Sequence, residues 1–273
     1  MEHLKTALDK ARTKRESVSE GRGKHGQRRQ LVNHTGSSEA SGINYTETAV
    51  VDLDESVLEA NRIITHDKTD PRGACFDILR TKVLKNMARM GAKTLAITSA
   101  TPENGKSVIA INLAFSIAQL SELSVLLVDF DLRRPAIGQY LGIKRDVSFF
   151  DHLHGEVPLE ATMINPGRPR IVVIPNQKPV INASETLASQ HVLDLVAELK
   201  RRYPDRIVIF DLPPLLGIDD ALVVLPHIDA SLLVVGSDIC KTGELEESRR
   251  LLADHNLIGV VLNKSGAQPA DYY

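Results

Sequence analysis

The stretch KTLAITSATPENGKSVIAINLAFSIAQL, residues 93–120, decides the fold. It opens with a short apolar run typical of a buried strand and closes with a longer apolar segment of helical length. Between them lies SATPENGKS, residues 99–107, with the spacing Ala-x4-Gly-Lys-Ser. In a strand–loop–helix unit of this kind, the backbone N–H groups of the loop and the positive end of the helix dipole bind phosphate. The stretch therefore predicts a phosphate-binding loop.

Two side chains of this loop carry the expected chemistry. Lys106 would reach the β and γ phosphates of a nucleotide, and Ser107 would give its hydroxyl to Mg²⁺. Ala100 stands where such loops usually begin with glycine, and a small residue satisfies that position. The residues that we expect to contact the nucleotide are Thr101, Pro102, Glu103, Asn104, Gly105, Lys106, Ser107 and Val108.

Outward from the loop, short β-branched strands alternate with helices. This alternation predicts an α/β fold in which a mostly parallel, twisted sheet is flanked by helices on both faces. The predicted strands are 93–100, 124–131, 171–175, 206–212, 230–237 and 257–263. The predicted helices are 54–64, 70–90, 105–120, 184–203 and 242–256.

Acidic residues follow two of these strands. In VLLVDFDLRRP, residues 125–135, Asp129 and Asp131 lie two apart and share a face if the segment is extended. In IVIFDLPP, residues 207–214, Asp211 follows four apolar residues. The carboxyl ends of parallel strands lie beside the phosphate loop, so these acids are candidates for Mg²⁺ ligation and proton acceptance.

The composition excludes several classes of protein. The chain has 273 residues, 42% of them apolar, and a net charge of −2, which argues against a protein that coats nucleic acid. Cys75 and Cys240 lie far apart without a Cys-x-x-Cys pair, which makes a zinc or iron–sulfur site unfavourable. No signal peptide and no apolar run long enough to span a bilayer is present, so we expect a cytoplasmic protein.

The amino-terminal segment differs in composition from the rest of the chain. Residues 1–45 contain nine Lys/Arg against five Asp/Glu, and residues 17–45 have the composition of a linker. Residues 1–16 have the apolar spacing of a short amphipathic helix, either a solvated basic helix or a docking segment for a partner or lipid surface. We therefore predict a flexible basic arm (1–49) with a possible short helix, a phosphate-loop domain (50–265) and a flexible tail (266–273).

Taken together, these motifs resemble those of the bacterial tyrosine kinases. The resemblance rests on SATPENGKS, VLLVDFDLRRP, IVIFDLPPLLGIDDALVVLPHIDASLLVV and GVVLNK, and it runs from about residue 50 to the end. Its most specific part is VDFDLRRP, a second acidic motif that ordinary phosphate-loop ATPases lack. These kinases are cytoplasmic autokinases of capsule and exopolysaccharide export, and their fold is that of the MinD/ParA-like phosphate-loop ATPases with a deviant Walker motif.

The resemblance implies roles for the residues named above. ATP and Mg²⁺ are the implied cofactors, and the implied reaction transfers the γ-phosphoryl group of ATP to protein tyrosine. Lys106 and Ser107 would bind phosphate and Mg²⁺. Asp129 and Asp131 would serve as catalytic base and metal-site acid. The remaining implied site residues are Arg133, which supports the site, Asp211, which completes the metal shell, and Asn263, near the adenine.

The family ends in a tyrosine cluster that a neighbouring subunit phosphorylates. This chain ends in PADYY, so Tyr272 and Tyr273 are the implied phosphoacceptors. Two adjacent tyrosines in a tail could also arise by chance, but the chain has only five tyrosines in all.

Two departures from the family pattern stand out. The family loop usually has Gly-Glu before Gly-Lys-Ser, whereas this chain has Glu103 and Asn104. The family's ring-forming helix usually carries Glu-x-x-Arg-x-x-Arg, and the matching positions here are Ala74, Asp77 and Arg80. Only Arg80 matches this pattern, so the resemblance does not extend to ring assembly through this patch, although a homo-oligomer is still expected.

The resemblance also implies partners. A membrane chain-length regulator or co-polymerase would activate the kinase, contact with the inner membrane would be indirect, and no nucleic acid is expected. The alternative is an ATPase switch of the partitioning or division-site type. Thr101 stands where that class carries its signature lysine, which favours the kinase. A scaffold for iron–sulfur clusters is disfavoured by the lack of paired cysteines.

Overall fold

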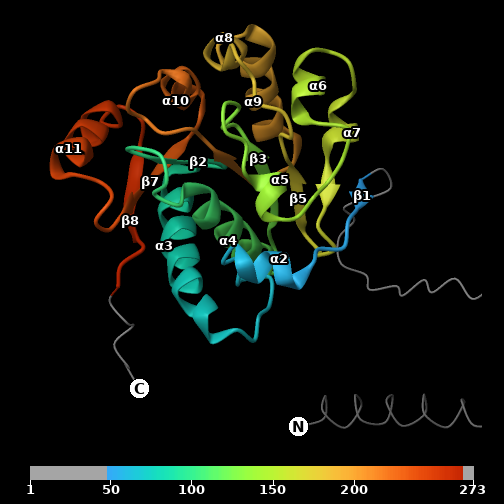
Figure 1. Cartoon of the computed structure of the whole chain (residues 1–273), viewed down its shortest axis with the longest axis horizontal. Helices are drawn as coiled ribbons and strands as arrows, with labels where there is room; N and C mark the ends of the chain where they lie inside the picture. Colours follow the sequence, from blue (N-terminus) through green and yellow to red (C-terminus); the bar gives the residue numbers. More distant parts are fainter. Residues whose placement is uncertain (1–47, 267–273) are drawn as a thin grey trace, which may run out of the picture. The chain divides into compact units, whose positions relative to one another are not determined.

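The computed structural model describes residues 48–266 (Figure 1), in which one eight-stranded sheet has the order β1-β4-β5-β3-β6-β2-β7-β8. Neighbouring strands are parallel except β4 and β5, which are antiparallel. The strands are β1 (Ala49–Val50), β2 (Thr94–Ser99), β3 (Ser124–Asp129), β4 (Ile164–Asn165), β5 (Ile171–Ile174), β6 (Arg206–Asp211), β7 (Ala230–Gly236) and β8 (Leu257–Asn263). The predicted mostly parallel α/β sheet is confirmed.

Helices cover both faces of this sheet, as Figure 1 shows. Alternate residues of each central strand point to opposite faces: Leu95 and Ile97 join the cluster formed with α2, α3 and α4, whereas Ala96 joins the cluster formed with α9, α10 and α11. The helices are α2 (Glu55–Ala60), α3 (Ala74–Met90), α4 (Lys106–Ala118), α5 (Ile137–Tyr140), α6 (Phe149–Leu153), α7 (Leu159–Thr162), α8 (Ala183–Leu187), α9 (Gln190–Arg202), α10 (Asp220–Val224) and α11 (Thr242–Leu251), with short 3₁₀ turns η1 (Pro71–Gly73) and η2 (Leu225–His227).

The segment before β2 folds as its residues predict. The Asp70 carboxylate accepts a hydrogen bond from the N–H of Arg72 at 2.9 Å and caps η1, which leads directly into α3. Gly91 ends α3 with a left-handed φ of 64°, a conformation that glycine adopts without strain. The predicted helix 70–90 is therefore confirmed as a 3₁₀ turn followed by an α-helix.

The single helix predicted over 184–203 is wrong, because the structure has two helices there. α8 ends at Leu187, and α9 begins after Ser189, whose backbone is extended. The Ser189 hydroxyl accepts a hydrogen bond from the N–H of Val192 at 3.4 Å and starts the second helix. The apolar spacing continues through both helices, so the sequence pattern hides the break. The prediction also omitted the short elements β1, β4, α5, α6, α7 and α10.

The predicted end regions fall largely outside the described residues. Residues 1–47 of the predicted arm and residues 267–273 of the predicted tail, with Tyr272 and Tyr273, are not described. Within residues 48–266, no helix combines the length and the apolar character that crossing a bilayer requires.

Candidate functional site

The predicted phosphate loop joins β2 to α4 at the carboxyl edge of the sheet. Gly105 has a left-handed φ of 85° and is followed directly by the first helical residue, Lys106. A Cβ at Gly105 would lie 2.2 Å from the Nδ2 atom of Asn263. Glycine is therefore required here both for its backbone conformation and for the close approach of the Asn263 side chain.

A buried asparagine holds the loop in place. The Asn104 amide nitrogen donates to the carbonyl oxygens of Thr101 at 2.7 Å and Pro102 at 3.2 Å. Its Oδ1 atom accepts from the N–H of Gly236 at the end of β7, and its backbone oxygen accepts from Asn263 Nδ2 at 2.9 Å. Asn104, predicted as a nucleotide contact, thus places its side chain beneath the loop, where it ties the loop to β7.

Replacing Asn104 with alanine is expected to lower the unfolding free energy by about 2 kcal/mol, because the buried N–H of Gly236 loses its acceptor. Denaturant unfolding would measure the change. Asn86→Ala serves as the control, since the Asn86 amide donates at 3.2 Å to the carbonyl of Ile258 and the residue is partly exposed. Equal losses for the two variants would contradict a special role for Asn104.

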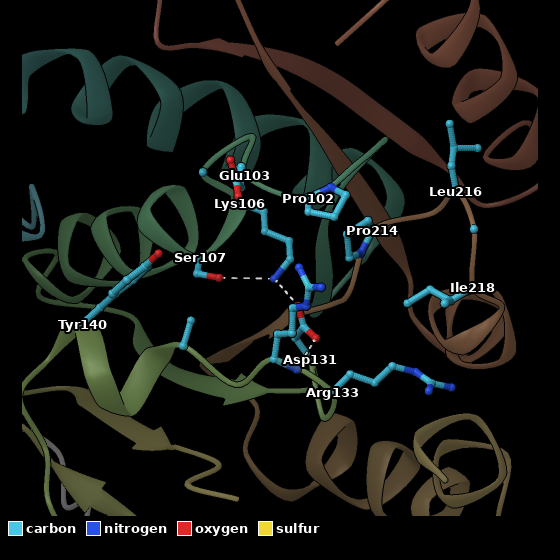
Figure 2. Close-up of a pocket in the computed structure, with 14 residues that line it drawn as sticks. Pro102, Glu103, Lys106, Ser107, Asp131, Arg133, Tyr140, Pro214, Leu216 and Ile218 are labelled. Carbon is cyan, nitrogen blue, oxygen red and sulfur yellow. Dashed lines mark hydrogen bonds and ion pairs between the residues drawn. The ribbon is translucent and has the colours of Figure 1, made fainter. Parts of the chain in front are cut away.

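Lys106 points into the site and bridges two acids. Its Nζ atom lies 3.4 Å from Asp211 Oδ1. It also lies 2.8 Å from Asp131 Oδ2 and donates to the Ser107 hydroxyl at 3.3 Å, as Figure 2 shows. Burial alone would lower the pKa of Lys106, but the charges of Asp211 and Asp131 outweigh this and raise it. Lys106 is therefore a cation in this arrangement, and the structure brings together four of the predicted site residues.

Asp129 lies at the end of β3, beneath this ion-pair network. Its Oδ2 atom accepts hydrogen bonds from the N–H groups of Ala136 at 3.0 Å and Ile137 at 3.1 Å. Its Oδ1 atom is buried and, within residues 48–266, has no hydrogen-bond partner. Burial, reinforced by the charge of Asp211, raises the pKa of Asp129 well above the usual range, although Lys106 acts in the opposite direction.

Ser107 and Asp211 have the chemistry of a magnesium site. Burial raises the pKa of Asp211, while Lys106 and a hydrogen bond with the Ser107 side chain lower it. The Oδ2 atom of Asp211 is buried and has no partner among the described residues. Mg²⁺ commonly takes one or two carboxylates and completes its shell with phosphate and water oxygens. Ser107, Asp211 and Asp131 therefore offer oxygen atoms that suit the ion, even though the described residues contain no cluster of three or more His, Cys, Asp or Glu with metal-binding geometry.

A cavity of about 370 Å³ opens beside these residues, within the usual range for small-molecule sites. One wall is the phosphate loop, and Asp131 lies at its base (Figure 2). Sequence reasoning missed the rest of the lining, which consists of Arg134, Ala136, Tyr140, Pro214, Leu216, Gly217 and Ile218. The segment after Asp211, LPPLLGIDD, could have indicated the apolar wall, because it continues directly from a predicted site strand.

Arg133 lines the same cavity, and its guanidinium is bound by a residue that does not line the cavity. Its guanidinium donates to both carboxylate oxygens of Asp220, at 2.7 and 3.0 Å, and Asp220 is fully buried at the start of α10. This two-point ion pair fixes the segment after β3 to the segment after β6. Asp220 is a further site-supporting residue that the sequence analysis did not single out.

Comparison with known proteins bears directly on this site. Residues 95–271 match the model of the CobQ/CobB/MinD/ParA nucleotide binding domain. The chain is 31% identical over 210 residues to tyrosine-protein kinase YwqD of Bacillus subtilis, an alignment that covers 76% of this chain and 87% of YwqD. The chain belongs to the bacterial tyrosine kinases. The solved kinase domain of the Escherichia coli tyrosine kinase ETK is 28% identical, with a TM-score of 0.69, and the match covers 82% of this chain and 93% of that domain.

Members of the kinase family differ in length. Tyrosine-protein kinase ptk of Acinetobacter johnsonii is 28% identical over 196 residues, which cover 71% of this chain and 26% of ptk. The chain thus spans about a quarter of that relative, whereas it spans most of YwqD.

The first departure from the kinase pattern has a structural consequence. Glu103 stands where the family loop usually has glycine, and its φ is 65°, in the left-handed region. That conformation costs a residue with a Cβ roughly 1 kcal/mol or more. The backbone at Glu103 therefore has the left-handed conformation that a glycine would adopt without strain, although the residue is not glycine.

Glu103→Gly is therefore expected to raise the unfolding free energy by roughly 0.5–1 kcal/mol, the relief of strain being partly offset by the freer unfolded chain. Thermal or urea unfolding measures this effect. Glu103→Ala retains the strained conformation and should give no gain. A gain of the same size in both variants would show that the Glu103 side chain, and not its φ angle, causes the strain.

The second departure lies on α3. Asp77 pairs with Arg80 at 2.8 Å, and both side chains bond Ser116 of α4: its hydroxyl donates to Asp77 at 2.9 Å, and its carbonyl accepts from Arg80 at 2.8 Å. The two charged residues of the degraded ring-forming pattern thus have partners within the chain.

Asn263 lies at the end of β8, where its amide supports the loop backbone at Asn104 and packs over Gly105. Its implied place near the adenine stays a prediction.

Proposed function

We propose that this protein is an ATP- and Mg²⁺-dependent protein-tyrosine autokinase. The observation that carries the proposal is the position of Lys106, held by Asp131 and Asp211 next to Ser107 at the start of α4. A phosphate-binding cation, a hydroxyl and acids from two strands meet there, beside a cavity. Phosphoryl transfer depends mainly on such positioning and charge neutralisation.

Nucleotide binding would rearrange these charges. When Lys106 turns to the phosphates, its ion pairs with Asp131 and Asp211 open. Ser107, Asp131 and Asp211 would then hold Mg²⁺, with Asp131 at the border of the cavity that would take the acceptor. When bound, Mg²⁺ neutralises charge on the phosphate oxygens.

We assign proton acceptance to Asp129, the last residue of β3. Asp129 acts as a base only when it is ionised: burial raises its pKa, whereas the neighbouring charge of Lys106 lowers it and favours the ionised form. Its unpartnered Oδ1 atom is the group that would accept the proton of the tyrosine hydroxyl. The bidentate pair of Arg133 with Asp220 keeps the segment that carries Asp131 in register.

The wider role follows from the family. We propose that Tyr272 and Tyr273 are phosphoacceptors and that phosphorylation occurs between copies in a homo-oligomer. The kinase would regulate polymerisation and export of capsule or exopolysaccharide. A membrane chain-length regulator would activate it and bring it to the inner membrane, with the basic arm 1–49 as a contact segment.

The proposal is tested by incubating the purified protein with Mg-ATP and locating phosphate by mass spectrometry. We expect phosphate on Tyr272 or Tyr273, and none in a Lys106→Met control. Release of free phosphate with unmodified tyrosines would support the alternative, an ATPase switch. If neither activity appears even with the cytoplasmic segment of a chain-length regulator added, the kinase proposal fails.

A further inference from the structure

An open edge strand adjoins a basic groove on the side of the domain formed by α3 and β8. β8 pairs with β7 on one side, and within the described residues no strand pairs with its other side (Figure 1). β8 is seven residues long and contains neither charge nor proline, and Val260 and Leu262 are 50% and 63% exposed. Soluble proteins usually cover or blunt such an edge, because it readily pairs with another strand.

The groove beside this edge carries positive charge. It has a volume of about 270 Å³ between α3 and β8, and its charged lining residues are Lys82, Lys85 and Arg89. No acid occurs among its described lining residues. Asn86 marks where the groove meets the strand, because its amide donates to the carbonyl of Ile258 at 3.2 Å. The groove therefore favours an extended segment that carries negative charge.

The chain itself supplies a segment of this kind directly after β8. The backbone bends at Lys264, whose φ is 57°, and Ser265 and Gly266 follow. The next seven residues, AQPADYY (267–273), equal β8 in length and include one acid and no basic residue. Their proline does not oppose strand addition, because a strand at the new edge tolerates a missing N–H.

We propose that residues 267–273 fold back along β8 as an added antiparallel strand and that the α3 groove receives Tyr272. With a three-residue loop at 264–266, Ala267 lies opposite Asn263, and Tyr272 lies opposite Ile258. Residues directly opposite in an antiparallel pair share a face of the sheet. Ile258 is the extra residue at an irregularity in the pairing of β8 with β7, and Ile258 to Val261 all line the groove. A Tyr272 ring at this end of β8 therefore lies at the groove, beside Lys85 and Arg89.

Docking of the tail in the groove would regulate the access of Tyr272 to the active site of a neighbouring copy. The unmodified tail covers the open edge and withdraws Tyr272 from a neighbouring active site. Once Tyr272 carries phosphate, Lys85 and Arg89 hold that phosphate by charge-assisted hydrogen bonds and keep the modified tail bound. The second step rests on the proposed kinase function, whereas the strand docking does not.

Disulfide trapping tests the strand docking in the full chain without nucleotide. In a Cys75→Ser/Cys240→Ser background, Val260→Cys is combined with Ala270→Cys, which lies opposite it in the proposed register. The control pair is Leu262→Cys with Ala270→Cys, offset by two residues and at a position that is more exposed than Val260. We expect the first pair to oxidise to an intramolecular disulfide several-fold faster than the control. Equal rates, no disulfide, or disulfide-linked dimers each overturn docking of the chain's own tail.

The phosphate step is tested by dephosphorylation. After incubation with Mg-ATP, a broad-specificity tyrosine phosphatase should remove phosphate from Tyr272 several-fold faster in Lys85→Gln/Arg89→Gln than in the unmodified sequence. Lys144→Gln/Arg249→Gln, two cations outside the groove, should not change the rate. Equal rates in all three proteins overturn phosphate capture by the groove. Absence of phosphate on any tyrosine instead contradicts the kinase function and leaves the trapping result to decide the docking.

Discussion

Lys106→Met is expected to reduce phosphoryl transfer at least ~10³-fold and also to destabilise the fold in a pH-dependent way. The loss of activity follows from the loss of the cation that reaches the phosphates. The loss of stability follows because Asp129, Asp131 and Asp211 are all buried and share this cation. Without it, like charges face one another in a poorly solvated site.

The direction of the pH effect follows from the acids. Lys106 lowers the pKa values of Asp129 and Asp211, so both rise further when it is removed. A carboxyl group whose pKa is higher in the folded than in the unfolded state favours folding at low pH, and this contribution is lost as pH rises through the folded-state pKa. The loss of unfolding free energy in Lys106→Met, relative to the unmodified protein, should therefore be small near pH 5 and grow to about 2–3 kcal/mol near pH 8.

Urea unfolding at the two pH values measures this deficit. The double variant Lys106→Met/Asp131→Asn provides the control, since it removes one negative charge from the same site. It should regain part of the stability at the higher pH and remain inactive. If Lys106→Met unfolds at the same urea concentration as the unmodified protein at both pH values, the two ion pairs contribute nothing to folding.

The site could be predicted as far as its residues lie at strand ends or within a short motif. Lys106 and Ser107 come from one contiguous loop, and Asp131 and Asp211 come from two strands that a parallel sheet places side by side. The side-chain arrangement follows because all these segments end at the same edge of the sheet.

The features that could not be predicted depend on contacts between distant segments. Asn104 bonds Gly236, and Arg133 pairs with Asp220, which follows a different strand. No local pattern marks either partnership. The break at Ser189 was hidden for a related reason: helical apolar spacing continues across it, and one capping hydroxyl decides where the second helix begins.

Gly105→Ala is expected to impair nucleotide binding by the loop more severely than any other single-methyl change. The new Cβ would lie 2.2 Å from Asn263 Nδ2, and the φ of 85° would be strained for alanine. Relief requires Asn263 to move, which breaks its 2.9 Å hydrogen bond to the carbonyl of Asn104. We expect a loss of about 2–3 kcal/mol in stability and a roughly tenfold or greater loss in nucleotide affinity.

The two causes can be separated with Asn263→Ala. Gly105→Ala/Asn263→Ala removes the clash but keeps the backbone strain, so it should be more stable than Gly105→Ala and less stable than Asn263→Ala alone. Denaturant unfolding gives the coupling between the two positions, and titration with a fluorescent ATP analogue gives the affinity. Strictly additive effects on the unfolding free energy would mean that the Asn263 side chain does not restrict the residue at position 105. Strong coupling would show that the amide at the end of β8 sets how closely the backbone of the phosphate loop can pack.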